Sequence, residues 1–209
     1  MEDYRTIRGT ATGEYEEKKS RFIASLSFAD SEEAAVAFLE QVRAANRTAR
    51  HNVYAYRLRE GNRERYSDDG EPAKTAGTPA LEVLQHSGLT DLIVVVTRYF
   101  GGVLLGTGGL VRAYSSAVKE GIAASKIGTM RYGVRLKICT DYKGIGKIQY
   151  ILRQNGLEAE DTVYTDQVEL TVLLAAECVP GLKKEITEAT AAKAGIEEVE
   201  KLYFVAPDA

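Results

Sequence analysis

The chain has 209 residues, of which 44% are hydrophobic and 27% charged, and its formal net charge is −3. This composition is typical of a soluble globular protein, and the length allows one large or two small domains. The start of the chain, MEDYRTIRGT, contains no apolar signal core, and the apolar runs are too short to span a bilayer. We therefore expect a cytoplasmic protein without a membrane segment.

The cysteines and histidines do not suggest a metal site. Cys139 and Cys178 lack the C-x-x-C spacing of zinc sites, and His51 and His86 are far from them in the sequence. Two reduced thiols are the expected state in a cytoplasmic protein. We predict neither a metal nor a cofactor.

The N-terminal part predicts a strand pair followed by a helix. Ser20 to Phe28 has the pattern of a strand and should pair with residues 13–17. Asp30 is expected to cap the helix, since Glu33 follows three residues later as in a capping box. The apolar positions of this helix are Val36, Leu39 and Val42.

A hairpin and a second helix should follow. Residues 52–59 and 63–67 predict two strands joined by a Gly-Asn turn. Thr78 is expected as the N-cap of the helix, with Pro79 at its first position. The helix should end at Gly88.

The most informative stretch is LIVVVTRYFGGVLLGTGGLVRAY, residues 92–114. Its apolar start predicts a strand buried on both faces, and the spacing of its last apolar residues predicts a helix. The glycines between them suit a backbone with positive φ, or one that something approaches closely. These glycines are Gly101, Gly102, Gly106, Gly108 and Gly109.

Two arginines flank this glycine-rich segment. Arg98 and Tyr99 precede the loop, and Arg112 is placed in the first turn of the helix after it. A helix N-terminus offers free N–H groups and the positive end of a dipole, so loop and arginines together predict an anion site. Neither the Walker A sequence nor the G-x-G-x-x-G spacing is present. The alternative is a structural junction, in which the glycines allow close packing and the arginines pair with carboxylates.

A polar loop precedes the second predicted helix. It contains Asp68, Asp69, Glu71, Lys74 and Thr75. Three carboxylates could hold a metal or act in acid–base chemistry if they converged on a pocket. We favour the alternative, in which the Asp-Asp-Gly sequence makes a turn and the carboxylates meet Arg98 or Arg112.

The rest of the chain predicts a second domain. Its apolar pattern gives the order strand, helix, strand, strand, helix, strand, which is that of the ferredoxin-like split βαβ fold. We place the boundary at residues 127–133, so that the domains are 1–130 and 134–209. The strands are expected at about 134–140, 157–164, 168–174 and 196–205, and the helices at about 145–155 and 179–195.

Charge differs between the two parts. Residues 1–133 hold 18 Lys and Arg against 17 Asp and Glu, and residues 134–209 hold 9 against 13. Neither balance is that of a strongly basic nucleic-acid-binding domain. An RNA contact would need a local patch in the first domain, and arginines on a solvated hairpin are the competing explanation. The arginines concerned are Arg47, Arg50, Arg57, Arg59, Arg63 and Arg65.

Several segments resemble one protein family. VVVTRYFGGVLLGTGGLVRAY, preceded by DDGEPAKTAGTPALEVL, is similar to the IMPACT family, including its bacterial members of the YigZ and YvyE type. EEKKSRFIA and RHNVYAYR support the resemblance, and the segments together span about residues 13–114 in order. Arg21 and His51, which lie in these two supporting stretches, are added to the candidate binding residues.

The resemblance implies an α+β fold and a link to translation. The first domain would share the class of ribosomal small-subunit proteins and elongation factor G domain IV, and the second would be similar to the last domain of elongation factor G. Eukaryotic members regulate translation with an additional N-terminal domain, so their specific mechanism does not carry over to this chain. Fold kinship alone does not fix a function.

We therefore predict a two-domain binding protein linked to translation regulation. It would contact RNA, the ribosome or a translation factor through the glycine-rich face of the first domain. A phosphate-type anion at the loop would fit this prediction. The alternative is an enzyme that uses the glycine-rich loop to bind phosphate or a nucleotide.

Overall fold

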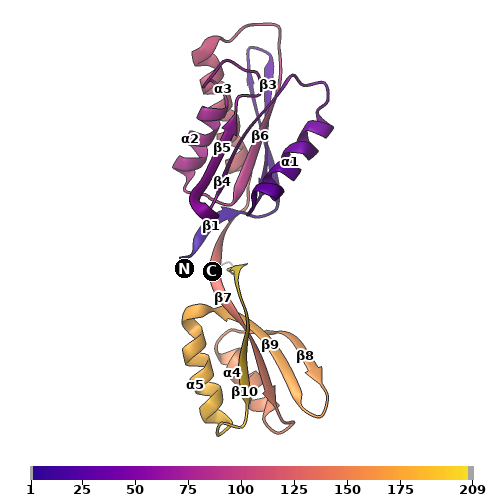
Figure 1. Cartoon of the computed structure of the whole chain (residues 1–209), viewed down its shortest axis with the longest axis vertical. Helices are drawn as coiled ribbons and strands as arrows, with labels where there is room; N and C mark the ends of the chain where they lie inside the picture. Colours follow the sequence, from indigo (N-terminus) through magenta and orange to yellow (C-terminus); the bar gives the residue numbers. More distant parts are fainter. Residues whose placement is uncertain (1, 207–209) are drawn as a thin grey trace. The chain divides into compact units, whose positions relative to one another are not determined.

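The computed structural model describes residues 2–206, and the chain divides into two compact units between Thr129 and Met130 (Figure 1). The first unit comprises residues 4–129, and the second comprises the rest. Each unit combines helices with a β-sheet, which confirms the predicted α+β class. Within the described range, no helix is both long and apolar enough to cross a membrane.

The sheet of the first unit is antiparallel, with strand order β2-β3-β6-β4-β5. The strand β6 is central, and its residues 92–96 are buried, as the apolar run predicted. The pairing of β2 with β3 is also confirmed. The strands are β1 (Tyr4–Ile7), which lies outside this sheet, β2 (Thr10–Glu17), β3 (Ser20–Phe28), β4 (His51–Leu58), β5 (Arg63–Ser67) and β6 (Leu92–Tyr99).

Helices cover both faces of this sheet (Figure 1). Helix α1 (Glu32–Ala45) buries Leu39 and Val42 on one face. Helices α2 (Gly77–Ser87) and α3 (Gly106–Ala123) pack on the other face, around Tyr114 and Leu84. The sheet is therefore the middle layer of three.

The starts of α1 and α2 differ from the prediction. Ser31, not Asp30, is the N-cap of α1, and its hydroxyl accepts the N–H of Ala34 at 3.2 Å. Val36, predicted to face the core, is 45% exposed. Thr78 lies inside α2 and does not cap it. The predicted end of α2 is confirmed, since the next residue, Gly88, adopts a left-handed conformation.

The glycine-rich segment is shorter than predicted. Helix α3 begins at Gly106, so three of the five glycines lie in its first turn, and Arg112 lies in the second turn. A side chain at Gly101 would overlap the backbone of Lys19 and Ser20, which explains the glycine there by close packing. Gly102 and Gly106 have φ values of +87° and +70°, which favour glycine.

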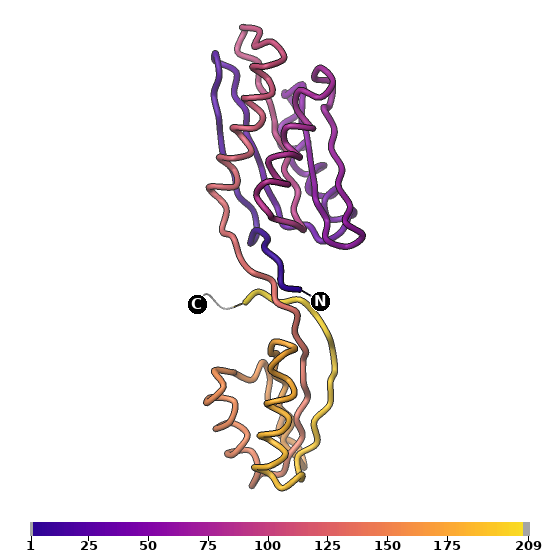
Figure 2. Tube along the Cα trace, turned by 90° about the vertical axis from the view of Figure 1, so that its left-hand side faces the viewer, coloured from indigo at the N-terminus to yellow at the C-terminus, as the bar shows by residue number. Residues whose placement is uncertain are grey.

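The second unit has the predicted split βαβ order. Its strands are antiparallel in the order β10-β7-β9-β8, and its two helices pack on one face over a core that includes Leu136 and Ile148 (Figure 2). The last helix ends earlier than predicted. The elements are β7 (Ile127–Thr140), α4 (Ile145–Gln154), β8 (Ala159–Tyr164), β9 (Val168–Ala175), α5 (Val179–Ala189) and β10 (Gly195–Val205).

Candidate functional site

Four connections meet at one end of the first unit (Figure 1). They are the β2–β3 turn, the α1–β4 connection, the β5–α2 loop and the β6–α3 loop, at residues 18–19, 46–50, 68–76 and 100–105. They meet because antiparallel strands and the helices packed on them reverse direction at the same edge of the layers. This end therefore gathers most of the candidate site residues, which are far apart in the sequence.

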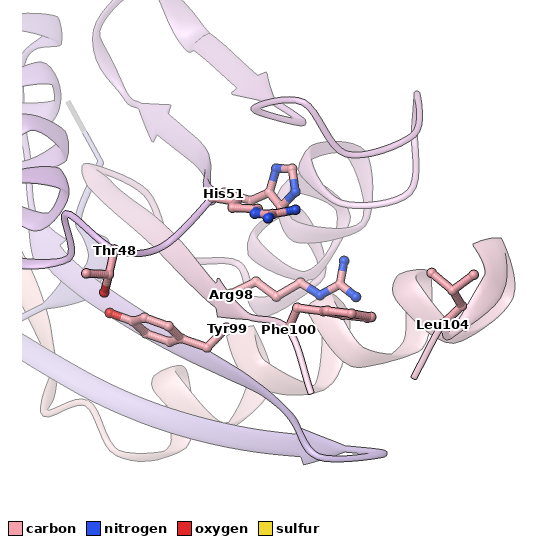
Figure 3. A pocket seen from close by; sticks show the side chains of 7 residues that line it. Thr48, His51, Arg98, Tyr99, Phe100 and Leu104 are labelled. Carbon is pink, nitrogen blue, oxygen red and sulfur yellow. The ribbon is translucent and has the colours of Figure 1, made fainter. Parts of the chain in front are cut away.

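A cleft of about 480 Å³ opens at this end, and we call it the Arg98 cleft. Figure 3 shows the Arg98 guanidinium beside the Phe100 ring, with His51 on its other side. Leu104 lies beyond the guanidinium and the Phe100 ring, and Thr48 and Tyr99 lie together on the side away from Leu104. The lining residues are Thr48, Arg50, His51, Arg98, Tyr99, Phe100 and Leu104.

Arg98 is buried in the wall of the cleft. It is paired in register with Phe22 of β3 and His51 of β4, so these three side chains form one row across the sheet. The side chain is 9% exposed, and its Nη1 donates to Oε1 of Glu71 at 2.6 Å. The guanidinium carbon lies 5.5 Å from the Phe22 ring centroid and 5.7 Å from that of Phe100, within the range of cation–π attraction.

Glu71 joins Arg98 to helix α3. Its side chain is 4% exposed, and the same Oε1 accepts the hydroxyl of Tyr114 at 2.8 Å. Burial and the nearby Glu71 carboxylate raise the pKa of Tyr114, so the phenol stays protonated and donates. One loop carboxylate therefore pairs with Arg98, as the structural alternative for this loop expected.

Of the three guanidinium nitrogens of Arg98, Nη1 donates a hydrogen bond to Glu71. Its Nε is buried and has no hydrogen-bond partner among residues 2–206. Its Nη2 likewise makes no hydrogen bond within that range. A guanidinium carries five N–H donors, so Arg98 keeps donors that a ligand in the cleft could use.

A hydrogen bond fixes which ring nitrogen of His51 carries the proton. Its Nδ1 lies 2.8 Å from the carbonyl oxygen of Asp69, and a carbonyl can only accept, so Nδ1 carries the proton. In the neutral ring Nε2 is then an acceptor. The Asp69 carboxylate accepts the backbone N–H of Asn52 at 2.6 Å and an N–H of Arg43 at 3.2 Å.

Asp68 and Thr75 of the β5–α2 loop also have partners within the fold. The Asp68 carboxylate accepts the backbone N–H groups of Lys74, Ala76 and Gly77 at 2.9, 3.1 and 2.8 Å, and it therefore caps helix α2. The Thr75 hydroxyl donates to the Pro72 carbonyl at 2.7 Å. No cluster of three or more His, Cys, Asp and Glu side chains suited to a metal occurs in the part of the chain that the structure describes.

Three further predicted site residues, Arg112, Arg21 and Tyr99, are placed differently from Arg98. Arg112 is exposed and does not line the cleft, so the structure does not bring it together with Arg98. Arg21 forms an exposed ion pair with Glu14 at 2.7 Å. Tyr99 lines the cleft, but its hydroxyl donates to Asn46 at the end of α1 at 2.8 Å.

The cations of the first unit differ in how they are paired. Those of the β4–β5 hairpin form ion pairs, which are Arg57 with Glu64, Arg59 with Asp91, and Arg63 and Arg65 with Glu32. Arg21, Arg43 and Arg98 also pair with carboxylates. Six others lie at or near the cleft end and form no ion pair within residues 2–206. We call them the free cations, and they are Lys18, Lys19, Arg47, Arg50, Lys74 and Arg112.

Sequence reasoning missed the apolar part of the site. Phe100 is 53% exposed and Leu104 is 83% exposed, although both are large and apolar. An exposed apolar residue beside a cleft is a frequent sign of a binding surface. Their position inside a glycine-rich loop was the available signal, since loops are usually polar.

The comparisons with known proteins agree with this architecture. The Impact N-terminal domain model matches residues 18–122, and a domain of unknown function, DUF1949, matches residues 139–193. The IMPACT family member YvyE of Bacillus subtilis is 35% identical over 205 residues, covering 98% of this chain and 94% of that protein. The IMPACT family member YigZ of Escherichia coli is 46% identical over 125 residues, 58% of this chain and 61% of that protein.

A solved structure is also similar. It is described as the crystal structure of a hypothetical protein, with a TM-score of 0.64, 34% identity, and coverage of 96% of this chain and 98% of that one. The fold and the glycine-loop end thus define a two-unit α+β protein with a candidate ligand cleft on its first unit. The chain belongs to the IMPACT family.

Proposed function

We propose that this protein is a cytoplasmic RNA-binding protein linked to translation, and that the cleft end of its first unit contacts the RNA. The observation that carries the proposal is the group of free cations around a cleft with exposed apolar side chains. Cations without carboxylate partners attract phosphates, and aromatic side chains stack on unpaired bases.

Two further considerations support the proposal. Membership of the IMPACT family supports a role in translation, because the resemblance implies one for the eukaryotic members. Two of the loop carboxylates, Asp69 and Glu71, pair with Arg43 and Arg98, which reduces their repulsion of an anion. The ribosome and a translation factor are more specific partners that the same surface could serve.

The alternative is an enzyme that binds phosphate or a nucleotide at the glycine-rich loop. Helix α3 has no side-chain cap, so its first N–H groups are available to an anion. Phosphoryl transfer would also need a carboxylate to hold Mg²⁺. The three carboxylates next to the loop are already bonded within the fold, which favours binding over catalysis.

Binding of a fluorescent single-stranded RNA at increasing salt tests the proposal. We expect the logarithm of the association constant to fall with the logarithm of salt with a slope of about −2 to −3.5, which corresponds to about three to five phosphate contacts on single strands. Replacing Arg47, Arg50 and Arg112 together by alanine should reduce both affinity and slope. Cosedimentation with ribosomes under the same conditions tests the more specific partner.

The matched control removes three exposed cations from the second unit, Lys143, Arg153 and Lys193. This variant loses the same formal charge and should bind RNA nearly as the unaltered protein does. Equal losses in the two variants would mean that net charge, and not the cleft end, controls binding. ATP turnover that disappears on Asp69→Asn, without any RNA binding, would favour the enzyme.

A further inference from the structure

We infer that the Arg98 cleft holds a single unstacked nucleotide of the RNA, with its base against Phe100 and its oxygens at Arg98 and Arg50. The inference rests on the proposed function and names the ligand at that site. It goes further because surface cations alone would bind single-stranded and double-stranded RNA alike.

The first argument concerns the unused donors of Arg98. The side chain is more than nine-tenths buried, and its Nε is buried without a hydrogen-bond partner in the described range, which costs free energy. Glu71 accepts from only one nitrogen. An acceptor oxygen placed in the cleft would use Nη2, and guanidinium groups bind phosphate and base oxygens well.

The second argument is the apolar part of the cleft wall. Phe100 and Leu104 are exposed and line the same cleft as Arg98, with the Phe100 ring beside the guanidinium (Figure 3). A nucleotide has an apolar base face on one side and charged oxygens on the other. The cleft has the same division, with an aromatic ring beside cations.

The third argument is size and position. A volume of about 480 Å³ lies within the range of small-ligand sites, which is large enough for one nucleotide and too small for a duplex. Leu104 lies two residues before the uncapped start of α3. The uncapped N–H groups of that helix thus follow the cleft wall directly in the chain and suit a neighbouring phosphate.

Together these features favour single strands. In a duplex the bases are stacked and paired, so only phosphates would meet the free cations. His51 adds an acceptor at Nε2 next to the donors of Arg98 and Arg50. An unstacked base edge carries both donors and acceptors, and this combination can bind it.

Fluorescence anisotropy with the full chain tests the inference. The probes are a labelled single-stranded RNA hexamer, a labelled blunt-ended RNA duplex, and unlabelled nucleoside monophosphates as competitors. We expect the hexamer to bind more tightly than the duplex. Phe100→Ala should weaken hexamer binding about tenfold or more, as loss of one base–aromatic stack does, and leave duplex binding nearly unchanged. Phe100→Tyr should restore the affinity.

The control variant is Tyr150→Ala, which removes a 60% exposed aromatic side chain from the second unit and should have no effect. If RNA binds but Phe100→Ala and Arg50→Ala leave the preference for the hexamer intact, the cleft inference fails and the proposed function stands. If a nucleoside monophosphate competes as strongly as the hexamer, the cleft is a small-molecule site and the inference also fails. If neither RNA binds the unaltered protein, both proposals fail.

Discussion

Replacing Arg98 with methionine should strongly destabilise the first unit. Methionine keeps most of the volume between Phe22 and Phe100 but removes the charge that balances Glu71. The Glu71 carboxylate, 4% exposed, would then keep only the hydroxyl of Tyr114. Removing one partner of a buried ion pair typically costs about 3–5 kcal/mol, because the remaining charge stays buried and unpaired.

A double variant separates the contribution of the Glu71–Arg98 ion pair to stability from the contribution of side-chain packing. Glu71→Gln together with Arg98→Met leaves no buried charge, and the glutamine oxygen can still accept from Tyr114. We expect the double variant to be more stable than the sum of the two single variants implies, by about 1–3 kcal/mol of interaction free energy. A buried pair often contributes little relative to a neutral replacement, so the double variant should fold.

Urea unfolding followed by hydrogen exchange provides the assay. The chain contains no tryptophan, so the amides of β6 report the first unit more directly than fluorescence does. Arg153→Met, at an exposed position of the second unit, is the control. A cost below about 1 kcal/mol for Arg98→Met would refute the reasoning, since a buried, charge-balanced Arg98 cannot be so weakly coupled to the fold.

Three other results are expected. Burial raises the pKa of Tyr114 above that of a tyrosine in the unfolded chain. The free energy of unfolding should therefore fall as the pH rises above about 10, by about 1.4 kcal/mol per pH unit for this residue. Tyr114→Phe should remove this pH dependence in alkaline urea titrations. Gly101→Ala should cost about 1–3 kcal/mol because the new methyl group meets the Lys19 backbone, whereas Gly146→Ala, in open space, should not lower the unfolding midpoint. Residues 130–209 alone should give a dispersed amide NMR spectrum, and a collapsed spectrum would show that this unit needs the first.

The sequence predicted the regular elements well because their signals are local. The apolar run of β6 and the strand–helix order of the second unit follow from side-chain periodicity. Ser31 replaced Asp30 as the cap of α1 because neighbouring residues with similar capping side chains cannot be ranked from local sequence. Such errors shift a helix by one residue and leave the fold unchanged.

The site was harder to predict because its contacts are long-range. Asp68 caps α2 from outside the helix, across a loop, so Thr78, which lies inside the helix, was the wrong candidate. The pairing of Glu71 with Arg98 depends on how the β5–α2 loop folds over the end of β6. Arg112 appeared close to the loop in the sequence, but the early start of α3 carries it out of the cleft.

These long-range contacts also explain how one arginine can serve the fold and a ligand. Glu71 holds the Arg98 guanidinium in place and balances its charge. The pair therefore offers directed N–H donors but adds no net charge to the cleft. In the proposed mode of binding, long-range attraction of RNA comes from the free cations, and the choice of an unstacked nucleotide comes from Phe100 and the donors of Arg98. Salt should therefore change how tightly RNA binds far more than it changes the preference for single strands.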